Sequence, residues 1–119
     1  LDGKDARALN ALGYILTNHS ENFVEARDLI TRALELEPGD PAIIDSMGWV
    51  EFRLGNLDAA ATLLREAYAR VQDPEIAAHL GEVLWQMGER DEARQVWSTA
   101  LAEHPEHGTL QETITRLTP

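Results

Sequence analysis

The amino-acid sequence predicts an all-α fold: an α-solenoid of about three helix-turn-helix repeats, closed by a C-terminal capping helix. Three glycines recur at one phase, because Gly13 and Gly48 lie 35 residues apart and Gly48 and Gly81 lie 33 residues apart. An alanine follows each glycine after 12 or 13 residues, at Ala26, Ala60 and Ala93. A period of this length is typical of stacked helical hairpins.

The repeat period divides the chain into five segments. They are the end of a truncated upstream repeat at 1–5, three repeats at 6–40, 41–73 and 74–107, and a capping helix at 108–119. The first segment is assigned because residues 1–5 resemble residues 36–40, which close the first complete repeat. We therefore expect the chain to be the C-terminal part of a longer solenoid that ends near its natural C-terminus.

Apolar residues spaced three and four positions apart predict two helices in each repeat. The expected helices cover 6–18, 23–37, 41–54, 57–71, 74–87, 90–103 and 109–117. Asp40 and Asp73 each place an N-capping carboxylate before a proline at the first helical position. Gly39, Gly55 and Gly88 are expected to end the helices before them, with Gly39 in the left-handed conformation.

The three mid-helix glycines require a steric reason, because glycine inside a helix costs about 0.5–1 kcal/mol relative to alanine. We interpret them as the points where the first helix of each repeat approaches the facing alanine of its partner. The large residues of the second helices, Ile30, Leu64 and Trp97, are expected to fill the wider gap between repeats. Trp97 is therefore predicted to lie in the core.

Composition excludes several classes of function. The chain has 10 Lys and Arg against 21 Asp and Glu, which gives a formal net charge of -11. Nucleic acid is therefore a poor partner, since binding it relies on cations that neutralise phosphates. The absence of cysteine excludes disulfides and thiol catalysis. No apolar run of about 18 residues is present, so we do not expect this chain itself to enter a membrane.

The repeats resemble the tetratricopeptide repeat (TPR) family, whose motif is Trp-x-x-Leu-Gly-x-x-Tyr followed by Ala-x-x-x-Phe, Ala and Pro. The three copies here have Leu9, Leu12, Gly13, Leu16, Ala26, Ile30, Ala33 and Pro38; Ile44, Met47, Gly48, Glu51, Ala60, Leu64 and Ala67; and Ala77, Leu80, Gly81, Leu84, Ala93, Trp97, Ala100 and Pro105. The signature Trp and Tyr are absent, and the second copy lacks its closing proline. The resemblance covers about residues 1–107 and implies protein binding through a concave groove.

A narrower resemblance covers roughly residues 45–117. This part is similar to the end of a long bacterial TPR lipoprotein of the outer membrane, which serves on the periplasmic side as adaptor for a carboxyl-terminal processing protease. The resemblance implies a periplasmic location and delivery of substrates to such a protease. The residues themselves are equally compatible with the cytoplasm.

In TPR proteins the first helix of each repeat lines the groove, and this implies which residues bind a partner. By position they are Tyr14, Asp45, Trp49, Phe52, Arg53, Glu82 and Trp85. We expect the four aromatic residues to be exposed, as anchors for a partner segment; the alternative is that they complete the packing between repeats. Some TPR domains hold a C-terminal carboxylate with Lys, Asn and Arg in these places. Carboxylates here disfavour such a ligand and favour basic segments.

No catalytic, cofactor or metal site is expected. His104 and His107 have metal-like spacing, with a glutamate before each, but Pro105 between them removes a common helical face. No nucleophile elbow or phosphate-binding glycine loop is present.

The sequence therefore predicts a protein-binding part of a larger scaffold or adaptor. Two alternatives stay open. The stack only extends a longer solenoid or self-associates, with weak association expected around Leu9, Leu12 and Leu16. The other is an enzyme or metal module built on His104 and His107.

Overall fold

A computed structural model describes residues 3–119 and places seven helices, and no strand, in this range. The helices are α1 (Gly3–His19), α2 (Phe23–Leu36), α3 (Pro41–Arg53), α4 (Leu57–Arg70), α5 (Pro74–Gln86), α6 (Arg90–Glu103) and α7 (Gly108–Leu117). The all-α fold is confirmed, and α2 to α7 begin and end within one residue of the predicted bounds.

The first helix differs from its prediction at both ends. It begins at Gly3, so residues 3–5 belong to α1 and do not form a turn that closes an earlier helix. Leu1 and Asp2, which completed that expected segment, lie outside the described residues. At the other end α1 extends one residue past the predicted bound, to His19, and the buried Thr17 hydroxyl in its last turns donates to the Gly13 carbonyl over 2.8 Å.

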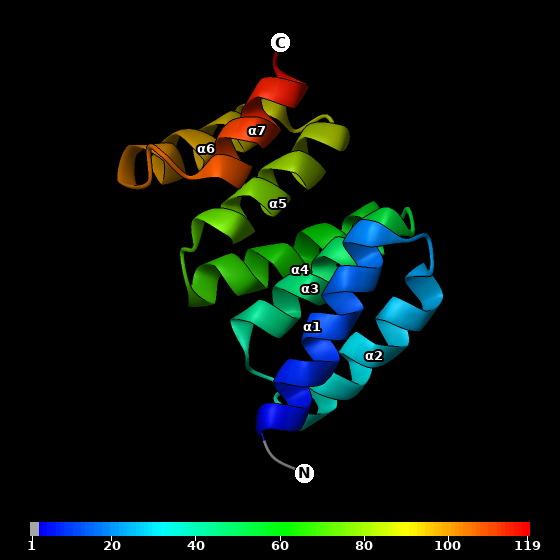
Figure 1. The fold of residues 1–119 in the computed structure, drawn as a ribbon. Helices are drawn as coiled ribbons and strands as arrows, with labels where there is room; N and C mark the ends of the chain where they lie inside the picture. The colour runs from blue at the N-terminus through cyan, green and yellow to red at the C-terminus, as the bar shows by residue number, and fades with distance from the viewer. Residues whose placement is uncertain (1–2) are drawn as a thin grey trace.

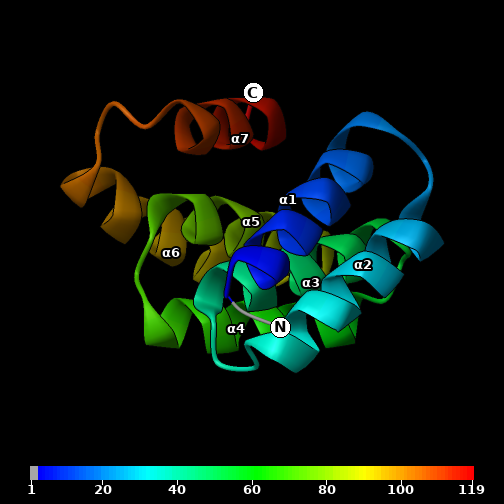
Figure 2. The same ribbon diagram turned by 60° about the horizontal axis from the view of Figure 1, so that its bottom comes forward.

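The helices form three stacked hairpins, α1–α2, α3–α4 and α5–α6, followed by α7 (Figure 1). Contacts between α1 and α3 and between α3 and α5 place the first helices on one side of the stack, which we call the concave side. The last helix, α7, packs mainly on α5 and less on α6 (Figure 2). The molecule measures 42 × 26 × 22 Å.

Two aspartate side chains cap the N-terminal ends of α3 and α5. The Asp40 carboxylate accepts from the Ala42 and Ile43 amides at 2.8 and 3.4 Å, and the Asp73 carboxylate accepts from the Glu75 amide at 2.8 Å, which confirms both predicted N-caps. Among the described residues, positive φ occurs at Gly55 and Gly88, each just past a helix end. Gly39 has no positive φ, so its predicted left-handed cap is wrong; α2 ends instead at Glu37, whose amide donates to Ala33.

The core explains the mid-helix glycines, with one correction. A Cβ at Gly48 would lie 2.7 Å from Leu64 Cγ and 3.3 Å from the Ala60 carbonyl oxygen, and a Cβ at Gly81 would overlap the Trp97 ring. The close helix approach at the alanine is therefore confirmed. The large residues, however, pack over the glycine of their own hairpin and do not fill only the gap between repeats. Trp97 lies in the core, as predicted, and is 2% exposed.

The first hairpin carries three of the four large apolar side chains that are exposed in the described residues. Leu12, Ile15 and Val24 are 49%, 53% and 60% exposed, whereas Leu9 and Leu16 are half-buried against the core. None of the helices in residues 3–119 is both long enough and apolar enough to cross a lipid bilayer.

Candidate concave binding site

Several polar side chains on the concave side are buried, although the side chains of an open groove would be exposed to solvent. Asp45, His79 and Glu82 are 6%, 4% and 7% exposed, and Tyr14 and Glu75 are half-buried beside them. We call Tyr14, Asp45, Glu75, His79 and Glu82 the polar layer. It joins α1, α3 and α5, because one or more members come from each of these helices.

A chain of hydrogen bonds runs through the polar layer. His79 Nδ1 lies 2.9 Å from Asp45 Oδ1, and His79 Nε2 lies 3.3 Å from the Tyr14 hydroxyl. The Tyr14 hydroxyl donates to Glu75 Oε1 over 3.5 Å. Since a protonated histidine donates from both ring nitrogens, this direction of donors suits the charged form of His79.

The pKa of His79 follows from the same contacts. Burial opposes its charge and lowers the pKa, but the Asp45 carboxylate, assisted by Glu75 and Glu82, outweighs burial, so the net effect raises the pKa of His79. Burial also raises the pKa of Tyr14 to about 12. The Asp45–His79–Tyr14 chain therefore links α3, α5 and α1 through buried and half-buried hydrogen bonds.

Trp49 is part of this packed region, and its predicted exposure is wrong. Its ring is 8% exposed and stacks on His79 with centroids 4.2 Å apart and on Phe52 with centroids 5.0 Å apart. Its indole Nε1 donates to Asn18 Oδ1 of α1 over 2.9 Å. The ring therefore closes the α1–α3–α5 contact, which is the alternative that the sequence left open.

Glu82 is also buried rather than exposed, because α7 covers it. Arg116 of α7 donates two hydrogen bonds to the Glu82 carboxylate, over 2.7 and 3.0 Å, and a third to Glu112 over 2.9 Å. The hydrogen bond to Glu82 raises the pKa of Arg116 further above its ordinary value. A partner cannot reach the Glu82 carboxylate unless α7 moves.

The other predicted groove residues point away from the polar layer, apart from Phe52, which is half-buried at its edge against Trp49. Arg53 is exposed and lies over the Phe23 ring of α2 at 5.1 Å. Trp85 is half-buried against Trp97, and two arginines of α6 lie over its ring at 4.6 and 5.0 Å. The structure therefore brings Tyr14, Asp45, Trp49, Phe52 and Glu82 together and leaves Arg53 and Trp85 outside.

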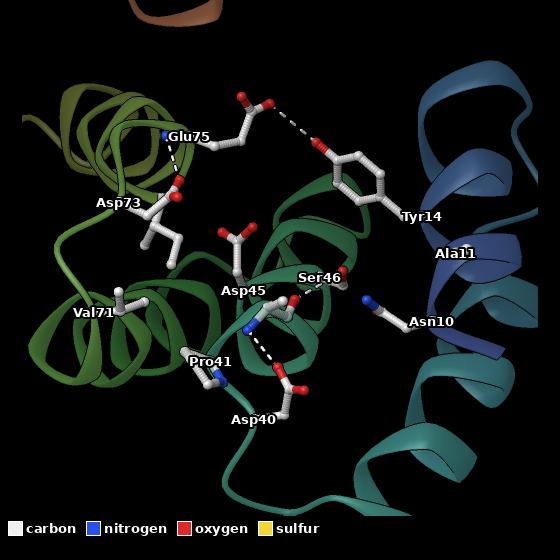
Figure 3. A pocket seen from close by; sticks show the side chains of 12 residues that line it. Asn10, Ala11, Tyr14, Asp40, Pro41, Asp45, Ser46, Val71, Asp73 and Glu75 are labelled. Carbon is white, nitrogen blue, oxygen red and sulfur yellow. Dashed lines mark hydrogen bonds between the residues drawn. The ribbon is translucent and has the colours of Figure 1, made fainter. Parts of the chain in front are cut away.

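An open cleft of about 380 Å³ remains on the concave side, beside the polar layer. It lies between α1 and the N-terminal ends of α3 and α5 (Figure 3). Apolar side chains, among them Ala11, Pro41, Val71 and Ile76, form part of its wall, and the carboxylates of Asp40, Asp45, Asp73 and Glu75 line the rest together with Asn10. The cleft is one part of the concave side that a partner can enter without moving a helix. A second hollow, of about 310 Å³, is lined by Tyr14, His79 and Glu82 together with Trp49 and residues of α7.

His104 follows the last residue of α6 and His107 precedes the first residue of α7, so the two histidines do not share a helical face, as the sequence indicated. His107 Nδ1 accepts from the Leu110 amide at 3.3 Å and so caps α7, while its Nε2 lies 3.6 Å from Glu75. No group of three or more His, Asp or Glu residues with metal-binding geometry occurs in the described part of the chain.

Sequence reasoning missed His79 and Arg116. His79 was not among the predicted groove residues, although it lies 34 residues after Asp45, which is one repeat. That spacing on two consecutive first helices was the available signal. Arg116 had no such signal, because the position of α7 over α5 does not follow from the repeat period.

The fold and its grooved first-helix side define a class of protein, the helical-repeat scaffolds. Within that class, the tetratricopeptide repeat family model matches residues 51–117, which is more than half of the chain. This chain belongs to the tetratricopeptide repeat family, as its motif residues indicated.

Two curated relatives match part of the chain. It is 54% identical over 78 residues to the TPR repeat-containing protein PA4667 of Pseudomonas aeruginosa, and the match covers 66% of this chain and 13% of that protein. It is 38% identical over 79 residues to the serine/threonine-protein kinase pkn3 of Myxococcus xanthus, covering 64% of this chain and 13% of the kinase. The chain thus matches only about an eighth of each relative.

Solved structures of TPR domains share the fold at low sequence identity. The first TPR of Spaghetti (RPAP3), bound to the HSP90 peptide SRMEEVD, superposes with a TM-score of 0.83 at 18% identity and covers 99% of this chain and 94% of its own. PcrH, in complex with the chaperone binding region of PopB, gives a TM-score of 0.79 at 19% identity. The match covers 98% of this chain and 94% of the PcrH chain.

Proposed function

We propose that this chain is a protein-interaction module that binds a segment of a partner protein in the concave cleft between α1, α3 and α5. The observation that carries the proposal is the cleft itself, which is open, partly apolar and lined by carboxylates. Specific recognition sites commonly combine such an apolar wall with a few placed polar groups. The TPR structures bound to an HSP90 peptide and to a region of PopB support this use of the fold.

The charge of the cleft distinguishes its partner from an acidic peptide. The peptide bound to the RPAP3 domain contains two glutamates and a C-terminal aspartate. Asp40, Asp45, Asp73 and Glu75 would repel such a ligand, since like charges brought together cost several kcal/mol at a desolvated interface. The partner segment of this chain is therefore neutral or basic, and its binding weakens as salt screens the charges.

The module is part of a longer adaptor in this proposal. Resemblance of residues 45–117 to a bacterial outer-membrane lipoprotein supports a place on the periplasmic side and delivery of substrates to a carboxyl-terminal processing protease. The partial match to a TPR protein of Pseudomonas aeruginosa agrees with a bacterial source for this repeat arrangement. Cell fractionation of the longer protein, followed by capture of the protease from the periplasmic fraction, tests location and partner together. Recovery of the protein in the cytoplasm would contradict both.

Selection of phage-displayed random peptides tests the groove. Ala11 is exposed and lines the cleft, so Ala11→Trp fills the cleft without entering the core, while Ala59→Trp adds the same bulk to exposed α4. We expect peptides selected on the parent chain to bind Ala59→Trp normally and to bind Ala11→Trp at least tenfold more weakly. Equal binding to both variants would place the binding site elsewhere.

A second function, stacking or self-association, is favoured by the exposed face of Leu12, Ile15 and Val24. Large exposed apolar side chains grouped on one face mark an interaction surface. Sedimentation of the chain over a hundredfold concentration range, with and without Leu12→Lys plus Ile15→Lys, tests this. A concentration-dependent mass that the double variant abolishes would establish self-association.

A further inference from the structure

Tyr14 and Glu75 lie at the boundary between the two hollows of the concave side. Both residues line the cleft of about 380 Å³ and also the second hollow of about 310 Å³. The Tyr14 hydroxyl donates to Glu75 Oε1 over 3.5 Å, and Figure 3 shows this hydrogen bond crossing the cleft between α1 and α5. A partner segment that runs from one hollow into the other therefore meets this bond.

The Tyr14 hydroxyl has a second neighbour, His79 Nε2, at 3.3 Å. A phenol hydroxyl has one hydrogen, so it donates either to Glu75 or to His79. Burial raises the pKa of Tyr14 to about 12, so the hydroxyl keeps this hydrogen near neutral pH. The state of the His79 ring therefore decides which of the two acceptors the hydroxyl serves.

The His79 ring is held in one orientation by its other contacts. Nδ1 lies 2.9 Å from the Asp45 carboxylate, and the ring stacks on Trp49 with centroids 4.2 Å apart. In the neutral ring the Nδ1 hydrogen donates to Asp45, which leaves Nε2 as an acceptor for the Tyr14 hydroxyl. In the protonated ring Nε2 donates to the Tyr14 oxygen instead, and the hydroxyl hydrogen turns to Glu75.

Titratable and charged groups from four helices surround His79 or line the same hollow. They are Tyr14 and His19 of α1, Asp45 of α3, Glu75 and Glu82 of α5, and Glu112 and Arg116 of α7. Burial lowers the pKa of His79, but the Asp45 carboxylate, followed by Glu75 and Glu82, raises it by more. His79 therefore loses its proton above its ordinary pKa of 6.5 and not below it.

We propose that the proton on His79 controls a gate between the two hollows, formed by the Tyr14 hydroxyl and Glu75. With His79 protonated, the hydroxyl binds Glu75, ties α1 to α5 and closes the gate. When the proton leaves to solvent, the hydroxyl turns to His79 Nε2, Glu75 is released from α1, and a partner segment can lie across both hollows. This inference rests on the proposed function, because it specifies how pH regulates binding on the concave side.

Side-chain NMR of the labelled chain tests the gate without a ligand. The ring ¹⁵N shifts of His79 follow its protonation, the ¹³Cδ shift of Glu75 follows the loss of its donor, and the ¹³Cζ shift of Tyr14 follows the change of acceptor. We expect all three to change with one midpoint above pH 6.5, and the neutral ring to carry its hydrogen on Nδ1. A neutral ring with its hydrogen on Nε2 overturns the gate, and so does a His79 that never titrates in the folded chain.

His107 has to be separated from His79 in this experiment, because its Nε2 lies 3.6 Å from Glu75 Oε2. The same ring ¹⁵N spectra give the midpoint of His107. A Glu75 midpoint that follows His107 and not His79 would overturn the gate, since the carboxylate would then respond to the wrong ring.

Tyr14→Phe and Tyr68→Phe form a matched pair, because each removes one hydroxyl from a half-buried ring and Tyr68 lies on α4, outside both hollows. Without the Tyr14 hydroxyl, the Glu75 shift should lose most of its change at the His79 midpoint, whereas Tyr68→Phe should leave it as in the parent. An equal change in all three chains would overturn the gate, because the charge of His79 would then act on Glu75 through space alone. If Tyr14→Phe does not fold, the three midpoints of the parent decide.

A peptide from the phage selection tests the regulation. The peptide is acetylated, contains no histidine, and shifts the amide signals of both Ile76 and Thr113, so that it reaches both hollows. Its affinity for the parent and for Tyr68→Phe should rise about fivefold as the pH passes the His79 midpoint, because one hydrogen bond no longer has to be broken. Its affinity for Tyr14→Phe should not depend on pH.

The two proposals fail separately. A chain that selects no peptides but shows one midpoint for His79, Tyr14 and Glu75 would overturn the proposed function and retain the gate. Peptides that reach both hollows of the parent with an affinity independent of pH would overturn the regulation and leave the proposed function intact.

Discussion

The interior of each hairpin and the concave side of the stack are held together by different kinds of contact. Between paired helices, a glycine faces an alanine and a large apolar residue, as at Gly48, Ala60 and Leu64. On the concave side, by contrast, charged and aromatic residues of three hairpins contact one another through hydrogen bonds, as in the Asp45–His79–Tyr14 chain.

The difference is one of specificity. Apolar packing between paired helices depends on volume, so similar residues fill the same positions in every repeat. A buried polar contact depends on donors and acceptors that come from different repeats, and leaving one unpaired costs about 1–3 kcal/mol. The hairpin core is therefore repeated along the chain, whereas the concave layer differs from one repeat to the next. The two tryptophans Trp97 and Trp49 represent the two regions.

Removing Trp97 should have the largest effect. Trp97→Ala deletes a ring that is 2% exposed and packs over Gly81, so we expect a loss of about 3–5 kcal/mol in the free energy of unfolding. Urea unfolding followed by circular dichroism measures it. Trp85→Ala, at a half-buried ring, should cost clearly less. Equal losses would mean that the hairpin core is not what stabilises the last repeat.

The second-largest loss of stability is expected when a mid-helix glycine is replaced by alanine, and this change compares the last two hairpins with each other. Gly81→Ala places a Cβ into the rigid Trp97 ring, and we expect a loss of about 1–3 kcal/mol. Gly48→Ala meets Leu64, whose side chain can rotate, and gains about 0.5–1 kcal/mol of helix preference. Its net cost should therefore be smaller. Thermal unfolding of both variants decides the order, and a larger cost at Gly48 would contradict it.

Exchanging each tryptophan for phenylalanine compares the two regions directly. Trp49→Phe removes the hydrogen bond from Nε1 to Asn18, which should cost about 1 kcal/mol beyond the change in volume. Trp97 Nε1 is buried without an acceptor, so Trp97→Phe loses no hydrogen bond. Combining Trp49→Phe with Asn18→Ala in a double-mutant cycle isolates the bond. A coupling energy near zero would show that Trp49 acts by packing alone.

The smallest effect is a pH dependence of the concave layer. The pKa of His79 is raised in the folded chain above its unfolded value of about 6.5, chiefly by Asp45 against the effect of burial. Protonated His79 therefore stabilises the fold below about pH 6.5, and this contribution is lost as the pH rises through the folded pKa. The free energy of unfolding should fall as the pH rises above about 6.5, less steeply in Asp45→Asn. Parallel curves would exclude the contribution.

Most of the fold could be predicted from the chain because its signals are local. Asp40 and Asp73 cap helices next to themselves in sequence, and Gly55 and Gly88 end helices at their own positions. Trp97 was assigned to the core from its place in the repeat. Gly39 shows the limit of such rules, since an alternative helix end at Glu37 made the left-handed cap unnecessary.

The candidate site was predicted only in part. Position within the repeat assigned Tyr14, Asp45, Trp49 and Glu82 to the first-helix face, and they do meet there. Trp49 was wrongly predicted to be exposed, because position gives the direction of a side chain but not what covers it. Their role in partner binding stays a prediction, and one open part of the concave side lies beside them, around Asn10 and Ile76.

By itself, the sequence determined that this protein is a stack of helical hairpins of the TPR family with an acidic surface, because period, caps and net charge are properties of neighbouring residues and of composition. Only the tertiary structure decided which carboxylates are free. His79 neutralises Asp45 from the next repeat, and Arg116 covers Glu82 from a helix outside the repeat pattern. Such pairings depend on how elements distant in sequence settle against one another, and the energy of a buried charge depends on its neighbours in space.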